Sequence, residues 1–159
     1  MAVSVRRANL QDYDDVMAIT GNTVLYNGFD YLPRQFHAIL TSHGGGHVLE
    51  VDGRIVGFVA FALTDDGRSF TARAGRVHPD FQKRGLFKLL QDRGTEDLIA
   101  SYPTINSRKW TIDASNPKAT QLMDAANVLC SGRKFLVCPL DQYRKEHLAN
   151  IINSAGIAE

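Results

Sequence analysis

The chain has 159 residues, 44% of them hydrophobic and 22% charged, and a formal net charge of +1 from 18 basic and 17 acidic residues. This composition is typical of a globular protein with a full hydrophobic core, and it excludes a disordered or fibrous chain. The balanced charge indicates no nucleic acid and no membrane as partner, and no apolar run is long enough to cross a bilayer.

The two cysteines, Cys130 and Cys138, lie in one apolar stretch without the spacing of zinc ligands. We therefore expect no metal site and two reduced core thiols. The first ten residues contain Arg6 and Arg7 but no apolar signal core. The expectation is a cytoplasmic protein, a monomer or homodimer, with a single domain over residues 1–159.

The first quarter of the chain predicts one strand and two helices. Alternation at Val3 and Val5 indicates a short strand, and helical spacing from Leu10 to Thr20 indicates a helix with Asn9 as its N-cap. A second helix is expected over about residues 33–40, with Pro33 in its first turn.

Three strands should follow as an antiparallel meander. Residues 47–51 and 54–63 flank Asp52-Gly53, which is a good type I′ turn, and residues 69–77 form the next strand. After it come a leucine-rich helix (86–99), a short strand (108–113), a helix from Asn116, a strand (135–138) and a final helix from Asp141. The predicted fold class is α/β, a mixed central sheet containing an antiparallel meander and flanked by helices.

The stretch from Arg76 to Phe87, RVHPDFQKRGLF, runs from a strand through a short loop into the first turn of a helix. The first N–H groups of a helix lack partners and carry partial positive charge, so an anion fits there. Gly85 allows close approach of a ligand, and Lys83 and Arg84 add charge. The pattern favours a pyrophosphate site; the alternative is an ordinary turn with solvated polar side chains.

The complete pattern Val-x-Pro-x-x-Gln-x-x-Gly-x, from Val77 to Leu86, resembles the cofactor motif of the GCN5-related N-acetyltransferases (GNAT). The order of elements over nearly the whole chain is similar to that family's too. The resemblance implies the GNAT fold, acetyl-CoA as co-substrate and transfer of the acetyl group to an amine acceptor. Two alternatives stay open: a weak or inactive acyl-CoA-binding module, and a protein N-acetyltransferase.

The resemblance also implies site residues. The Val77 backbone would bind the pantetheine arm, and the N–H groups from Gln82 to Phe87 would hold the pyrophosphate. Asn116 begins an Asn-x-x-Ala segment that would touch the pantetheine arm, or it simply caps a helix. The full implied cofactor set is Arg76, Val77, His78, Gln82, Lys83, Arg84, Gly85, Leu86, Phe87 and Asn116.

Three positions depart from the family pattern. Phe87 replaces a small residue, Met123 stands where a tyrosine often acts as general acid, and Arg73 stands where a glutamate often acts as base. No catalytic residue is therefore predicted.

A narrower resemblance lies in residues 28–33, GFDYLP. This segment is similar to the corresponding region of vertebrate histidine N-acetyltransferase-like proteins, which are longer than this chain. It implies a small amino-acid acceptor such as L-histidine, acetylated at its α-amine. Asp30 would pair with the acceptor ammonium and Tyr31 would pack on an acceptor ring. Alternatively, Tyr31 anchors the loop in the core and Asp30 caps the following helix.

Overall fold

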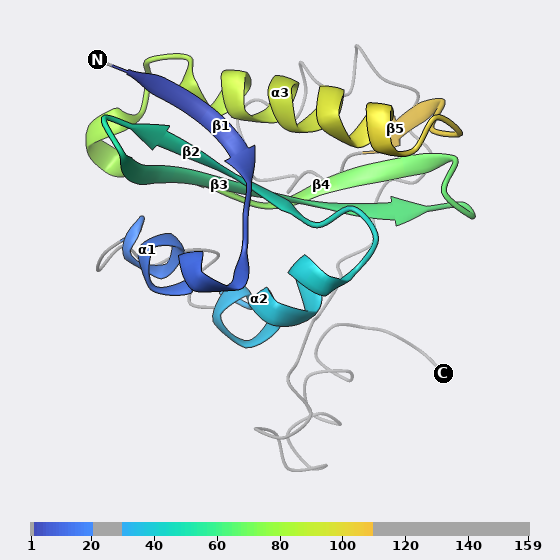
Figure 1. Cartoon of the computed structure of the whole chain (residues 1–159), viewed down its shortest axis with the longest axis horizontal. Coiled ribbons are helices and arrows are strands. Elements are labelled where there is room, and N and C mark those ends of the chain that lie inside the picture. Colours follow the sequence, from blue (N-terminus) through green and yellow to red (C-terminus); the bar gives the residue numbers. More distant parts are fainter. Residues whose placement is uncertain (1, 21–29, 110–159) are drawn as a thin grey trace, which may run out of the picture. The chain divides into compact units, whose positions relative to one another are not determined.

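A computed structural model of the chain describes residues 2–20 and 30–109 (Figure 1). These residues all fall within one compact unit. The elements are β1 (Val3–Arg7), the 3₁₀ turn η1 (Leu10–Asp12), α1 (Tyr13–Ala18), α2 (Leu32–Thr41), β2 (Gly46–Val51), β3 (Arg54–Thr64), β4 (Ser69–Val77), the 3₁₀ turn η3 (Pro79–Phe81), α3 (Leu86–Ser101) and β5 (Ser107–Lys109).

The strands of the described residues form one sheet in the order β1-β2-β3-β4-β5. Neighbours from β1 to β4 are antiparallel, whereas β4 and β5 are parallel. The predicted mixed sheet with an antiparallel meander is therefore confirmed. Asp52 and Gly53 both have positive φ, 49° and 80°, as a type I′ turn requires.

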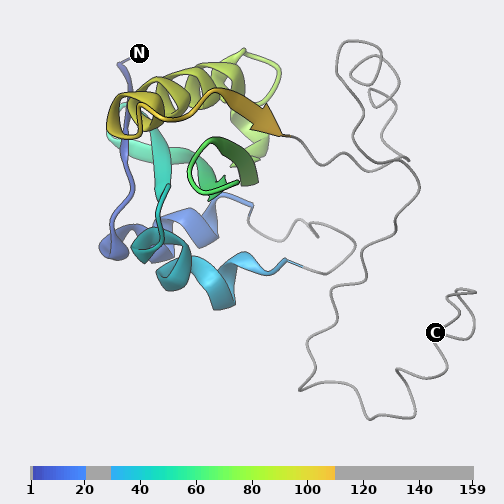
Figure 2. The same cartoon turned by 90° about the vertical axis from the view of Figure 1, so that its right-hand side faces the viewer.

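Helices cover both faces of this sheet. Figures 1 and 2 show α3 on one face and α1 and α2 on the other. Two buried clusters correspond to these layers. The α3 cluster contains Leu49, Val56, Val59, Phe61, Phe70, Leu86, Leu90 and Leu98. The α1/α2 cluster contains Val16, Ile19, Leu32, Phe36, Ile39, Val48, Phe58, Ala60 and Ala74. The sheet thus has two distinct apolar faces, each with its own helices.

The helix expected from Leu10 begins instead as η1 and continues as α1. The Asp12 carboxylate accepts a hydrogen bond from the Asn9 N–H at 2.8 Å, and the Arg6 guanidinium binds both carboxylate oxygens at 2.8 and 2.9 Å. These bonds hold a tight first turn and tie it to β1. Asn9 is the cap, as predicted, because its side chain accepts from the N–H of Gln11.

The elements expected after residue 109 lie outside the described residues, as do Cys130 and Cys138. Residues 110–113 of the strand expected over 108–113 also lie outside them. A single domain over residues 1–159 stays a prediction.

Candidate active site

A bulge interrupts the ladder between β3 and β4 shortly before β4 ends. Ala74 and Gly75 together stand opposite one residue of β3, Val59. Ala74 has a φ of 54°, in the left-handed region that residues other than glycine rarely adopt. The described β5 pairs with β4 only over residues 69–71. Within the described part of the chain, the far edge of β4 beside the bulge therefore has no strand partner.

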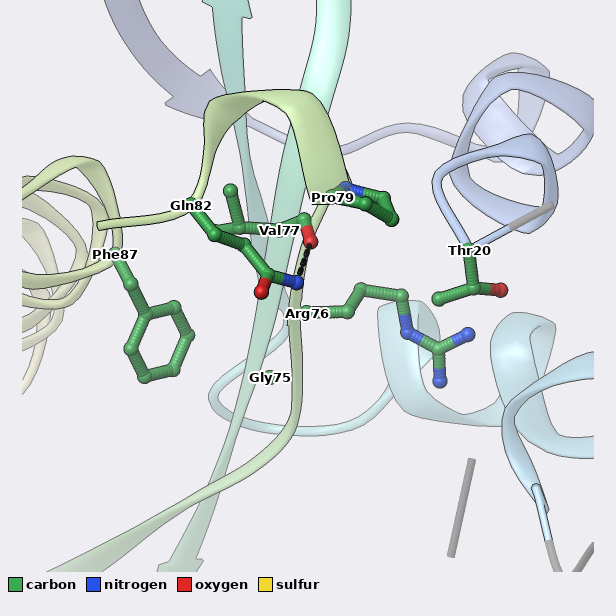
Figure 3. Close-up of a pocket in the computed structure, with 7 residues that line it drawn as sticks. All are labelled: Thr20, Gly75, Arg76, Val77, Pro79, Gln82 and Phe87. Carbon is green, nitrogen blue, oxygen red and sulfur yellow. Dashed lines mark hydrogen bonds between the residues drawn. The ribbon is translucent and has the colours of Figure 1, made fainter. Parts of the chain in front are cut away.

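The end of β4 presents its backbone to both sides. The His78 N–H donates to the Val56 carbonyl of β3 at 2.8 Å. The Val77 carbonyl points away from β3 and accepts a hydrogen bond from the Gln82 side-chain amide at 2.9 Å (Figure 3). The Gln82 side chain therefore connects the turn to the edge of β4 that has no strand partner among the described residues. We call this the free edge of β4, and it is the edge predicted to bind a pantetheine arm.

The turn before α3 has an unusual backbone. Lys83 and Gly85 both have positive φ, 59° and 73°, and α3 begins at Leu86 with no side-chain cap on its N–H groups. A β-carbon on Gly85 would have no atom within 4 Å. The Arg84 guanidinium lies over the Phe81 ring, 5.4 Å from its centre. The N-terminus of α3 is therefore open, positively polarised and flanked by cations.

A cavity of about 270 Å³ lies between this turn, the end of β4 and Thr20, which follows α1. Figure 3 shows Phe87 on one side and Thr20 on the other, with the Arg76 side chain extending away from Phe87. The Phe87 ring packs against Gly75 and remains 38% exposed. The lining residues are Thr20, Gly75, Arg76, Val77, Pro79, Gln82 and Phe87.

Arg76 forms a bidentate ion pair with Asp30. Its two terminal nitrogens donate to the two carboxylate oxygens, each at 2.9 Å, and the Arg76 side chain is only 2% exposed. Asp30 also accepts from the Leu32 N–H at 3.1 Å, at the start of α2. Burial would raise the pKa of Asp30, but the hydrogen bonds from Arg76 and Leu32 outweigh it and lower that pKa.

Tyr31 is partly buried beside the bulge. Burial raises the pKa of its phenol, while the charge of Arg73, the backbone N–H of Ala74 and the charge of Arg76 act in the opposite direction. The structure thus places Asp30 and Tyr31 next to β4. Their predicted roles toward an acceptor stay predictions.

The His78 side chain contacts the turn and not the cavity lining. Its Nε2 lies 3.1 Å from an Arg54 terminal nitrogen, and its ring lies 5.8 Å from the Phe81 ring, edge to face. Its Nδ1 faces Asp80, whose N–H lies 3.3 Å away. His78 therefore contributes a backbone N–H that bonds to β3 and an imidazole ring that packs against Phe81.

Sequence reasoning missed Thr20, Gly75 and Pro79 as lining residues. A glycine inside a predicted strand is a signal for a bulge or a close approach, and Gly75 carried that signal. Asn116 and Met123 lie outside the described residues. Over residues 2–20 and 30–109, no helix is long and apolar enough to cross a membrane, and no group of three or more His, Cys, Asp or Glu side chains could hold a metal ion.

Comparison with known proteins adds a family relationship. The model of the acetyltransferase (GNAT) family matches residues 14–126. The chain is 25% identical over 107 residues to a histidine N-acetyltransferase of Oreochromis niloticus, covering 67% of this chain and 31% of that protein. The chain thus spans about a third of the length of that curated relative.

Two solved structures have a similar fold. The ribosomal-protein-S18-alanine N-acetyltransferase of Escherichia coli superposes with a TM-score of 0.63 at 18% identity, covering 78% of this chain and 76% of that one. A GNAT family acetyltransferase of Brucella melitensis, solved with acetyl-CoA, superposes with a TM-score of 0.53 at 17% identity, covering 72% of this chain and 79% of that one. At these identities, the likeness concerns the fold alone.

Proposed function

The chain belongs to the acetyltransferase (GNAT) family, and we propose that it transfers the acetyl group of acetyl-CoA to the α-amine of a small amino acid, with L-histidine as first candidate. The observation that carries this proposal is the turn before α3. Its left-handed residues Lys83 and Gly85 leave the uncapped N–H groups of α3 open to a phosphate. The residues present therefore fit a pyrophosphate.

The remaining cofactor contacts are proposed at the end of β4, next to the same turn. The free edge of β4 at Val77 lies beside the turn, where it can bond the amides of a pantetheine arm. We assign Arg76, His78, Gln82, Arg84, Leu86 and Phe87 to this site through their backbones or the cavity wall, and Asn116 through the family pattern. When bound, acetyl-CoA supplies the acetyl group as a thioester, and the chain holds that thioester beside the acceptor amine.

The chemistry of the cavity lining also limits the protonation state in which the acceptor amine can react. Among the described lining residues there is no carboxylate and no imidazole, so none of them can take a proton from an ammonium, and we propose that the amine reacts in its neutral form. The α-amine of a free amino acid has a lower pKa than the ~10.4 of a lysine side chain, so a larger fraction of it is neutral at the same pH. The amine nitrogen then attacks the thioester carbon, the carbon–sulfur bond breaks, the thiolate leaves, and the amine proton passes to water. The relative from Oreochromis niloticus, a histidine N-acetyltransferase, supports the amino-acid class of acceptor.

The lack of a carboxylate or imidazole among the described lining residues also favours a second candidate, an acyl-CoA-binding module without turnover. Incubation with acetyl-CoA and a panel of L-amino acids and of peptides with free N-termini, with thiol release as readout, separates these candidates. Release above the rate without acceptor supports the enzyme. Thermal stabilisation by CoA without any release supports the binding module. Release only with peptides that carry free N-termini points to a protein N-acetyltransferase.

A further inference from the structure

The bulge in β4 places two arginines on one face of the sheet. Arg73 pairs with Ala60 and Arg76 with Phe58, and both β3 partners belong to the α1/α2 cluster. Residues three apart in a regular strand point to opposite faces, but the extra residue in β4 brings Arg73 and Arg76 to the same face. That face is the one that carries Asp30 and Tyr31.

The charges on this face do not balance. Arg76 is neutralised by Asp30 through two hydrogen bonds of 2.9 Å. Arg73 forms no ion pair with any described residue, and its buried Nε has no hydrogen-bond partner there. The charges of Arg73, Arg76 and Asp30 all act on the Tyr31 phenol, and their sum is one positive charge. A buried guanidinium donor without a partner costs free energy until an anion supplies one.

We propose that Arg73 binds the carboxylate of the acceptor amino acid, while Asp30 holds Arg76 in place beside it; this inference rests on the proposed function. A guanidinium matches a carboxylate in a planar, bidentate arrangement. Arg73 stands two residues before Gly75, a lining residue of the cavity, and two residues of strand span at most about 7 Å. An arginine side chain can span that length. A free amino acid carries its carboxylate one carbon from the amine, so binding it at Arg73 orients the amine.

The test compares acceptors that differ in this charge. Amidation also lowers the pKa of the α-amine, so kcat/KM is expressed per neutral amine in both series. The probes are a mixture of L-amino acids and the matching mixture of amino-acid amides, in which a neutral carboxamide replaces the carboxylate. With the wild-type protein, we expect kcat/KM to be about 10- to 100-fold higher for the acids than for the amides. Arg73→Gln should remove this preference by raising KM for the acids, without changing KM for acetyl-CoA.

Two further variants make the result specific. Arg73→Lys keeps the positive charge but loses the planar, bidentate guanidinium, so it should retain part of the preference for acids over amides that Arg73→Gln loses. Arg93→Gln removes an arginine that is 63% exposed on α3, on the other face of the sheet, and it should behave as wild type. Equal rates for acids and amides in the wild-type protein, or a preference that survives Arg73→Gln, would overturn the assignment of Arg73.

A protein without turnover is tested by binding. If no thiol is released with any acceptor, the proposed function fails, and the thermal shift produced by the amino-acid mixture in the presence of CoA becomes the readout. A shift that Arg73→Gln abolishes and Arg93→Gln retains supports carboxylate binding at Arg73. No shift, or a shift equal in both variants, overturns it.

Discussion

The ring of Phe87 occupies the space that a β-carbon on Gly75 would need: its Cζ and Cε2 atoms lie 2.6 and 2.8 Å from that position. The two residues belong to different elements, α3 and β4, and both line the cavity. The absence of a side chain at Gly75 is therefore what allows the first turn of α3 to lie against the bulge.

Gly75→Ala should push the Phe87 ring into the cavity and weaken acetyl-CoA binding. The ring is 38% exposed and can move, so we expect about a tenfold rise in Kd, equivalent to about 1.4 kcal/mol, and not a failure to fold. Phe87→Ala removes the clashing ring. The double variant should therefore bind acetyl-CoA as well as Phe87→Ala alone, measured by calorimetry. Simple addition of the two single effects would show that Gly75 and Phe87 do not act through this contact.

Gly85→Asp should abolish most of the cofactor affinity, and Gly85→Asn is its matched control. Both side chains tolerate the positive φ of 73°, and there is no atom within 4 Å for either β-carbon to strike. The aspartate adds a negative charge where the pyrophosphate is proposed to bind, so Kd for acetyl-CoA should rise at least about tenfold over the asparagine variant. Both variants should keep a free energy of unfolding within about 1 kcal/mol of wild type. Equal affinities of the two variants for acetyl-CoA would show that the pyrophosphate does not bind at this turn.

Much of the fold was predictable because its signals are local. Asp52-Gly53 marks a type I′ turn, and the structure gives both residues the positive φ that this turn needs. The strand–turn–helix around Gly85 was likewise predictable from a glycine at the start of an apolar helix. Such signals depend on the residues themselves and on their immediate neighbours.

The arrangement on the α1/α2 face was not predictable in the same way. Ala74 adopts a left-handed conformation without being glycine, asparagine or aspartate, and the neighbouring Gly75 indicates a bulge or a close approach without distinguishing between the two. The face to which Arg73 and Arg76 point depends on that bulge. The pairing of Arg76 with Asp30 joins residues 46 positions apart, which only the assembled sheet and α2 bring together. From the sequence alone, Asp30 is therefore predicted to bind substrate or to cap a helix, and its arginine partner is not predicted.

Asp30→Asn should destabilise the fold in a pH-dependent manner. The amide can still accept from the Leu32 N–H, but it leaves the buried Arg76 guanidinium without a counter-charge. Loss of one partner from such a pair costs about 3 kcal/mol at pH 7. Because folding lowers the pKa of Asp30, its stabilisation is present above the unfolded-state pKa of about 3.9 and is lost as the pH falls through the lower folded-state value.

Chemical unfolding of the two proteins between pH 7 and 3 measures this effect. The difference in free energy of unfolding between wild type and Asp30→Asn should shrink as the pH drops below about 4. Asp80→Asn removes a carboxylate that is 80% exposed and should change stability by less than about 0.5 kcal/mol. If the difference in free energy of unfolding between wild type and Asp30→Asn does not change with pH, the substitution destabilises the fold through altered packing and not through loss of the Asp30 charge.

His47 should make the fold less stable in mild acid. Its side chain is buried on β2, its Nε2 lies 2.9 Å from an Asp97 carboxylate oxygen on α3, and its buried Nδ1 has no hydrogen-bond partner among the described residues. Burial lowers the pKa of His47, and Asp97 offsets this only in part. As the pH falls through about 6.5, the unfolded chain takes up a proton that the folded imidazole does not.

The free energy of unfolding should therefore decline from pH 7 downward, by at most about 1.4 kcal/mol per pH unit, until the folded-state pKa of His47 is reached. His47→Gln can keep a donor toward Asp97 but does not titrate, so it should flatten this decline whatever its effect on absolute stability. His43→Gln removes an exposed histidine and serves as the matched control. The measurement is the slope of the free energy of unfolding against pH between pH 7 and 5. If this slope persists in His47→Gln, another group causes the acid sensitivity, and the burial of His47 does not.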